Sequence, residues 1–260
     1  MSRIARLIIW MSCCLLFCSG LNSCAIQSFI YPGADKEMPD AAHGKAEHAV
    51  TILTPEGTRL RGWFFNRGEG SPLVVCYGGN AMNVGYFTQM AAADTSRSYL
   101  LMNYRGYGDS AGEPSEALLV QDARYCLNIA RNTLGTPASV SLVGFSLGSG
   151  VAVQVAAAEQ VDSLVLVCPF DSMTEVACNF VPLLPRLLPL DSWESASYAP
   201  QIRCKVSIMR AKYDNIVPAS STDALIKAFD AARPSIFTFE ADHNTIFNAE
   251  GFKETLMRRL

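Results

Sequence analysis

Apolar residues occur along this chain in short continuous runs, which alternate with longer stretches whose apolar positions repeat every three to four residues. The short runs are typical of strands buried in a parallel sheet, and the periodic stretches are typical of helices packed on one side. The pattern predicts eight strands, at 47–53, 59–65, 72–77, 99–104, 140–143, 163–168, 205–210 and 235–239. It predicts helices at 81–95, from 115 onward, and at 147–160, 221–231 and 250–260.

Strands that alternate with helices predict an α/β fold, with a mostly parallel eight-stranded sheet covered by helices on both faces. One segment, 171–201, departs from this alternation, because it is apolar, is broken by Pro182, Pro185 and Pro189 and separates two strands. It follows the carboxyl end of a strand, the edge where such sheets bind ligands. We therefore expect a short helical cap over the site, and the alternative is a surface helix pair packed on the core.

The N-terminus predicts export from the cytoplasm. Arg3 and Arg6 precede an apolar run at 7–21, which is short for a membrane span, and Leu21-Asn22-Ser23-Cys24 resembles the lipobox of bacterial lipoproteins. We expect 1–23 to be a lipoprotein-type signal peptide, Cys24 to be lipidated, 24–45 to be a tether and 46–260 to be the domain. An uncleaved anchor and an ordinary cleaved signal are the alternatives. All three predict a location in the cell envelope, either membrane-anchored or periplasmic or extracellular.

Composition narrows the classes of partner. Half of the 260 residues are hydrophobic, 17% are charged, and the net charge is −3 without a long basic run, so we expect a globular domain and no nucleic-acid partner. Five cysteines follow the leader, in a spacing that matches no metal site, and the sequence selects no disulfide among them: Cys76, Cys126, Cys168, Cys178 and Cys204. We expect neither a metal nor a cofactor.

The stretch Gly144-x-Ser146-x-Gly148 joins a predicted strand to a predicted helix. A serine on such a sharp turn needs neighbours without bulk, and in return its hydroxyl is exposed above a helix N-terminus. The pattern predicts a nucleophile, and the alternative is a glycine-rich turn with a structural serine.

A serine nucleophile needs a base and a carboxylate. His243 follows the last strand and Asp214 follows the one before it, so both reach the carboxyl edge of the sheet together with Ser146. Asp171 is the rival acid, and Asp242 is too close to His243 in sequence and is expected to hold the loop.

The other two histidines, His43 and His48, lie before or within the first strand and are not expected to serve as the base. The oxyanion of the intermediate needs two backbone amides. We expect these from Leu147, directly after the serine, and from Asn80 in the turn Tyr77-Gly78-Gly79-Asn80. Asn80 could also be the N-cap of the helix predicted at 81–95.

Together these pieces resemble the α/β-hydrolase superfamily, and within it the membrane-associated serine hydrolases that include protein depalmitoylases. The matching motifs lie between 47 and 260: Gly79-Asn80-Ala81, the stretch 103–110 with Pro114-Ser115-Glu116, Gly144-Phe145-Ser146-Leu147-Gly148, Asp214 with Val217-Pro218, and His243-Asn244. The resemblance implies an α/β-hydrolase fold and esterase, thioesterase or, more distantly, peptidase activity.

The sequence therefore predicts a membrane-anchored serine hydrolase that cleaves carboxylic esters or thioesters, with a hydrophobic acyl group as a small-molecule or lipid-like substrate. An aminopeptidase of the same fold is one alternative, although the cap segment is poor in the acidic residues that a substrate amine would require. A non-catalytic envelope lipoprotein is the other, and an intact Ser, Asp, His set argues against it.

Overall fold

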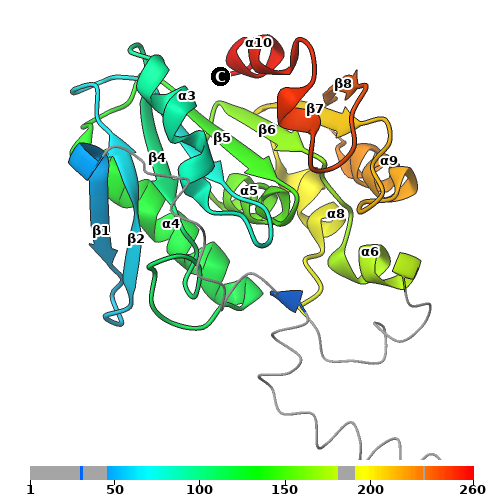
Figure 1. The fold of residues 1–260 in the computed structure, drawn as a ribbon, viewed down its shortest axis with the longest axis horizontal. Helices are drawn as coiled ribbons and strands as arrows, with labels where there is room; N and C mark the ends of the chain where they lie inside the picture. Colours follow the sequence, from blue (N-terminus) through cyan, green and yellow to red (C-terminus); the bar gives the residue numbers. More distant parts are fainter. Residues whose placement is uncertain (1–29, 32–45, 181–190, 231) are drawn as a thin grey trace, which may run out of the picture.

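The computed structural model describes residues 30–31, 46–180, 191–230 and 232–260. They form an eight-stranded sheet in the order β1-β2-β4-β3-β5-β6-β7-β8, in which β2 pairs antiparallel with both of its neighbours and all later pairs are parallel (Figure 1). The strands are β1 Ala49–Leu53, β2 Arg59–Phe65, β3 Leu73–Tyr77, β4 Ser98–Met102, β5 Val140–Phe145, β6 Ser163–Val167, β7 Lys205–Ala211 and β8 Ser235–Phe239. The predicted mostly parallel, eight-stranded sheet is confirmed.

Helices cover both faces of this sheet. The longer ones are α3 Thr88–Ala93, α4 Glu116–Thr133, α5 Leu147–Ala158, α6 Met173–Phe180, α9 Ala219–Ala228 and α10 Phe252–Met257. Short helical turns are η2 Ala46–His48, η3 Val84–Phe87, α8 Ser195–Tyr198, η4 Ala199–Gln201 and η5 Ile246–Asn248. In Figure 1, α3 and α10 lie on one side of the sheet, and α4 and α5 lie on the other.

Two apolar clusters fill the space between the sheet and its helices, because successive strand residues point to opposite faces. In β3, Val75 packs with the residues of α4 and α5, whereas Val74 and Cys76 pack with those of η3, α3 and α10. A strand that contributes to both clusters is buried on both sides, and this explains the unbroken apolar run that it has in the sequence.

The helix predicted at 81–95 is wrong as a single element. Asn83 accepts a hydrogen bond from the amide of Gly85 and begins the 3-10 turn η3, after which α3 covers only Thr88–Ala93. By contrast, the helix predicted from 115 is confirmed, because the side chain of Ser115 caps α4 by accepting from the amide of Leu118.

Several predictions fall wholly or partly outside the described residues. They are the signal peptide 1–23, lipidated Cys24, the tether apart from Ile30 and Tyr31, and positions 181–190 of the cap segment. The described ends of that segment are α6 and the stretch 191–201, where Trp193 packs against α5. Within the described ranges, none of the helices combines the length and the apolar character that a membrane crossing requires.

Candidate active site

Ser146 lies on the sharp turn between β5 and α5. Its backbone has a φ of 51° and a ψ of −118°, a conformation that residues with a side chain rarely adopt. The two flanking glycines are required by close contacts, since a Cβ on Gly144 would lie 2.3 Å from the Gly148 carbonyl oxygen. A Cβ on Gly148 would lie 2.2 Å from the carbonyl oxygen of Tyr77. The spacing of the motif is therefore a consequence of packing between α5, β5 and the turn after β3.

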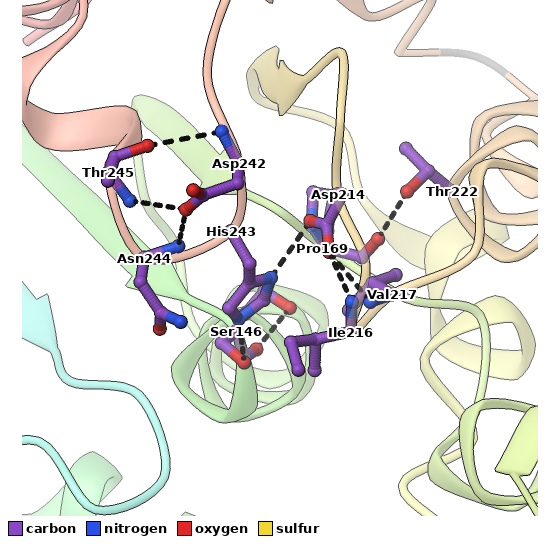
Figure 2. Close-up of polar contacts among 11 residues, drawn as sticks. Ser146, Pro169, Asp214, Ile216, Val217, Thr222, Asp242, His243, Asn244 and Thr245 are labelled. Carbon is purple, nitrogen blue, oxygen red and sulfur yellow. Dashed lines mark hydrogen bonds and ion pairs between the residues drawn. The ribbon is translucent and has the colours of Figure 1, made fainter.

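His243 follows β8 and lies between Ser146 and Asp214, as Figure 2 shows. Its Nε2 lies 3.0 Å from the Ser146 Oγ, and its Nδ1 lies 2.8 Å from the Asp214 Oδ2. The imidazole is buried and its ring contacts that of Phe145, with 5.1 Å between the centroids. A histidine held in this way can accept a proton from the serine while the carboxylate fixes its tautomer.

Asp214 is held by its own loop after β7. Its Oδ1 accepts hydrogen bonds from the backbone amides of Ile216 at 2.9 Å and Val217 at 2.8 Å, which leaves Oδ2 directed at His243. Burial alone would raise the pKa of this carboxyl, but the hydrogen bond and charge of His243, together with the two amides, outweigh it and hold the pKa below its usual range. Asp214 therefore remains an anion that can stabilise an imidazolium.

The other acidic candidates have different partners. Asp171 accepts a hydrogen bond of 2.5 Å from the hydroxyl of Ser221 and another from the amide of Ser172. Asp242 accepts from the amides at positions 244 and 245, and so it fixes the loop that carries the histidine (Figure 2). Of the other histidines, His48 stacks on Phe65 beside the first strands, and His43 lies outside the described residues.

The two predicted oxyanion donors belong to segments that lie next to Ser146. Leu147 begins α5, and the turn with Asn80 is close enough that a Cβ on Gly79 would lie 3.4 Å from the Ser146 Cβ. Within the described part of the chain, neither the Leu147 amide nor the Asn80 amide donates to another protein group. The Asn80 side chain does not cap a helix, because its Nδ2 donates to the carbonyl of Ile30 and its Oδ1 accepts from Tyr107.

Sequence reasoning named Cys168 among the five cysteines but did not place it beside Ser146, Asp214 and His243. It directly follows β6 and thus reaches the same edge of the sheet. Its thiol lies within 4.8 Å of the ligand atoms of Asp214 and His243, the one group of three potential metal-ligating side chains among the described residues. Burial, followed by the charge of Asp214, raises the pKa of the thiol well above its usual range. A metal ion held by these three groups would have to deprotonate the thiol and displace the hydrogen bond between His243 and Asp214.

A known family and several proteins of other organisms resemble this chain in sequence. A profile of the alpha/beta hydrolase fold family matches residues 71–191. An uncharacterised protein of Mycobacterium tuberculosis, Rv2307c, is 35% identical over 210 residues, which cover 78% of this chain and 72% of the relative. A protein of Saccharomyces cerevisiae named as an uncharacterised membrane protein, YNL320W, is 26% identical and covers 83% of this chain and 80% of its own length.

Solved structures share the fold. An alpha-beta hydrolase from Vibrio vulnificus superposes with a TM-score of 0.69 at 20% identity, over 90% of this chain and 92% of that one. The Pyrococcus furiosus esterase Pf2001 superposes with a TM-score of 0.66 at 16% identity, over 82% of this chain and 90% of that one. At such identities the likeness concerns the fold.

Proposed function

Because the chain belongs to the α/β-hydrolase superfamily, we propose that it is a serine hydrolase that cleaves carboxylic esters or thioesters. The observation that carries this proposal is the hydrogen-bonded line from Ser146 through His243 to Asp214, with distances of 3.0 Å and 2.8 Å. A binding protein has no need of a serine on a strained turn that is aligned with a buried histidine and an anion.

The proposed reaction has two halves. The Ser146 Oγ attacks the acyl carbon while His243 accepts the hydroxyl proton, and His243 then gives that proton to the departing alcohol or thiol as the bond to it breaks. Water, deprotonated by His243, next attacks the acyl-serine and releases the acid, with the proton returned to Ser146. Asp214 stabilises the imidazolium in both halves. The negatively charged oxygen of each tetrahedral intermediate would be held by the Leu147 and Asn80 amides.

We further propose that the acyl group is hydrophobic. The segment 171–201, which begins beside the reaction centre, is rich in apolar residues and contains a single basic residue, Arg186, so it is poorly suited to a strongly anionic substrate.

We also propose that lipidation of Cys24 anchors the enzyme at the membrane of the cell envelope. The leader sequence supports the anchor, and a relative named as a membrane protein is consistent with it.

A series of p-nitrophenyl esters from acetate to decanoate tests the proposed substrate. An apolar wall stabilises each buried methylene by about 0.8 kcal/mol, or about fourfold in kcat/KM, so kcat/KM should rise with chain length until the pocket is full. A profile that is flat or falls from acetate onward would exclude a lipophilic acyl pocket. Absence of hydrolysis across the whole series would contradict the proposed esterase activity itself.

A further inference from the structure

Two residues of the predicted tether are part of the folded domain. Ile30 and Tyr31 are 8% and 1% exposed, and both belong to the apolar cluster between the sheet and α4 and α5. They precede β1 by almost twenty positions in sequence. Their hydrogen bonds join them to Asn80, in the turn after β3, and to Asp191, in the segment 171–201. We call Ile30–Tyr31 the strap.

The strap contacts the candidate oxyanion turn directly. The carbonyl of Ile30 accepts a hydrogen bond of 2.6 Å from the Asn80 Nδ2, and the hydroxyl of Tyr107 donates to the Asn80 Oδ1 at 2.5 Å. Both ends of the Asn80 side chain are thus held, and the hydroxyl of Tyr104 donates to the carbonyl of Gly78 in the same turn at 2.8 Å. One of the two partners that hold the Asn80 side chain therefore lies fifty positions before it in sequence.

The other end of the strap is held by the base of the cap segment. The hydroxyl of Tyr31 donates to the Asp191 Oδ2 at 2.5 Å and accepts from the Trp193 Nε1 at 3.2 Å. The same Asp191 oxygen accepts from the amide of Glu116, at the start of α4. Burial, followed by the hydrogen bond to Asp191, raises the pKa of Tyr31 well above its usual range, so the phenol remains a neutral donor.

The same network reaches the helix that follows the nucleophile. The carboxylate of Glu116 accepts from the backbone amide of Trp193 at 2.9 Å and from the Gln154 Nε2 at 2.7 Å, and Gln154 belongs to α5. The Trp193 ring packs so closely on α5 that a Cβ on Gly150 would lie 2.9 Å from it. The strap is thus connected directly to the turn with Asn80 and, through Trp193 and Glu116, to α5, which begins with Leu147.

We propose that the strap is a positioning element of the oxyanion hole, in which Tyr31, fixed by Asp191 and Trp193, places the Ile30 carbonyl so that it orients Asn80. This inference rests on the proposed serine hydrolase function. Neither strap residue is expected to touch the reacting atoms. The chain that leads from the leader to the domain would then complete the active site as well as link it to the anchor.

The test is a double-mutant cycle on the full-length protein, with kcat and KM measured on p-nitrophenyl butyrate and thermal unfolding measured in parallel. Tyr31→Phe removes the hydroxyl and keeps the ring, and Asn80→Ala removes the side chain that the strap holds while its amide stays. We expect Tyr31→Phe to lower kcat about tenfold with KM within about twofold, because small misplacements of an active-site group cost rate rather than binding. In the Asn80→Ala background the same change should have no further effect on kcat.

Tyr99→Phe is the matched control. Tyr99 is also fully buried and its hydroxyl donates to a carboxylate, Asp94, but it lies at the start of β4, away from the carboxyl edge of the sheet. Its loss should lower the Tm without changing kcat. Should Tyr31→Phe fail to fold, Asp191→Ala removes the carboxylate that accepts from the Tyr31 hydroxyl and should give the same selective fall in kcat.

Three results would overturn the proposal: unchanged kcat in the strap variant, an effect that adds fully to that of Asn80→Ala, or an equal fall in kcat for Tyr99→Phe. Failure of the function itself has a separate signature, because the wild-type protein would then hydrolyse none of the esters. If the wild type hydrolyses esters and the strap variant has an unchanged kcat, only the proposed role of the strap is contradicted.

Discussion

The two sides of the candidate active site are built in different ways. On the His243 side, Ser146, Asp214 and His243 each follow a strand, and the three strands belong to one continuous parallel run from β5 to β8. On the candidate oxyanion side, the Asn80 side chain is held by hydrogen bonds to Ile30 and Tyr107, which lie far apart in the sequence. The His243 side is placed by backbone pairing, and the candidate oxyanion side is held by side-chain hydrogen bonds.

The sheet register explains how Ser146, Asp214 and His243 are brought together without hydrogen bonds to distant loops. Phe145 pairs with Val167, Val167 with Met209, and Ala211 with Phe239, so successive strands end at nearly the same level. The loops that follow these strands therefore begin side by side, and this brings the residues at their starts together. The oxyanion side depends on buried phenols and carboxylates, each of which leaves an unpaired polar group when its partner is lost. We therefore expect mutations on the two sides to differ in size and in character.

On the His243 side, the largest expected difference in kcat is that between substitutions of the two candidate acids, Asp214 and Asp171. Asp214→Asn should lower kcat by about 10⁴-fold, because an amide can hold the wrong tautomer of His243. Asp171→Asn should leave kcat within about threefold, since the partner of Asp171 is the Ser221 hydroxyl and a side-chain amide oxygen can still accept from it. Steady-state ester hydrolysis by the two isosteric variants makes each the control for the other. A severe loss in Asp171→Asn with little in Asp214→Asn would reverse the assignment.

A smaller effect is expected at Cys168, the second potential nucleophile near His243. Because burial and the charge of Asp214 raise its pKa, the thiol should be protonated and unreactive at neutral pH. Cys168→Ala should keep kcat/KM within about fivefold, and iodoacetamide should not inactivate the wild type. Ester hydrolysis before and after alkylation measures this, with Cys76→Ala as a control for loss of a fully buried thiol. A loss of several orders of magnitude in Cys168→Ala would place the thiol in the chemistry.

Sequence position was sufficient to expect the eight strands and the meeting of Ser146, Asp214 and His243 at one edge. Strand positions follow from local patterns, and parallel strands bring their carboxyl ends to the same edge of a sheet. It was not sufficient for the helix after Asn80, which Asn83 interrupts by capping a separate turn. Nor could it connect Tyr31 with Asp191, since that contact joins residues 160 positions apart and has no local signature. Cys168 could have been found, because it directly follows a strand as the triad candidates do.

The central claim, that Ser146 is the nucleophile activated by His243, is tested most directly by intact-protein and peptide mass spectrometry after reaction with a fluorophosphonate. The wild type should gain one phosphonyl group on the peptide that contains Ser146, and His243→Ala should react far more slowly. Ser146→Ala should keep the wild-type Tm and gain no adduct. An adduct of equal yield on Ser146→Ala, or one located on another residue of the wild type, would contradict the account.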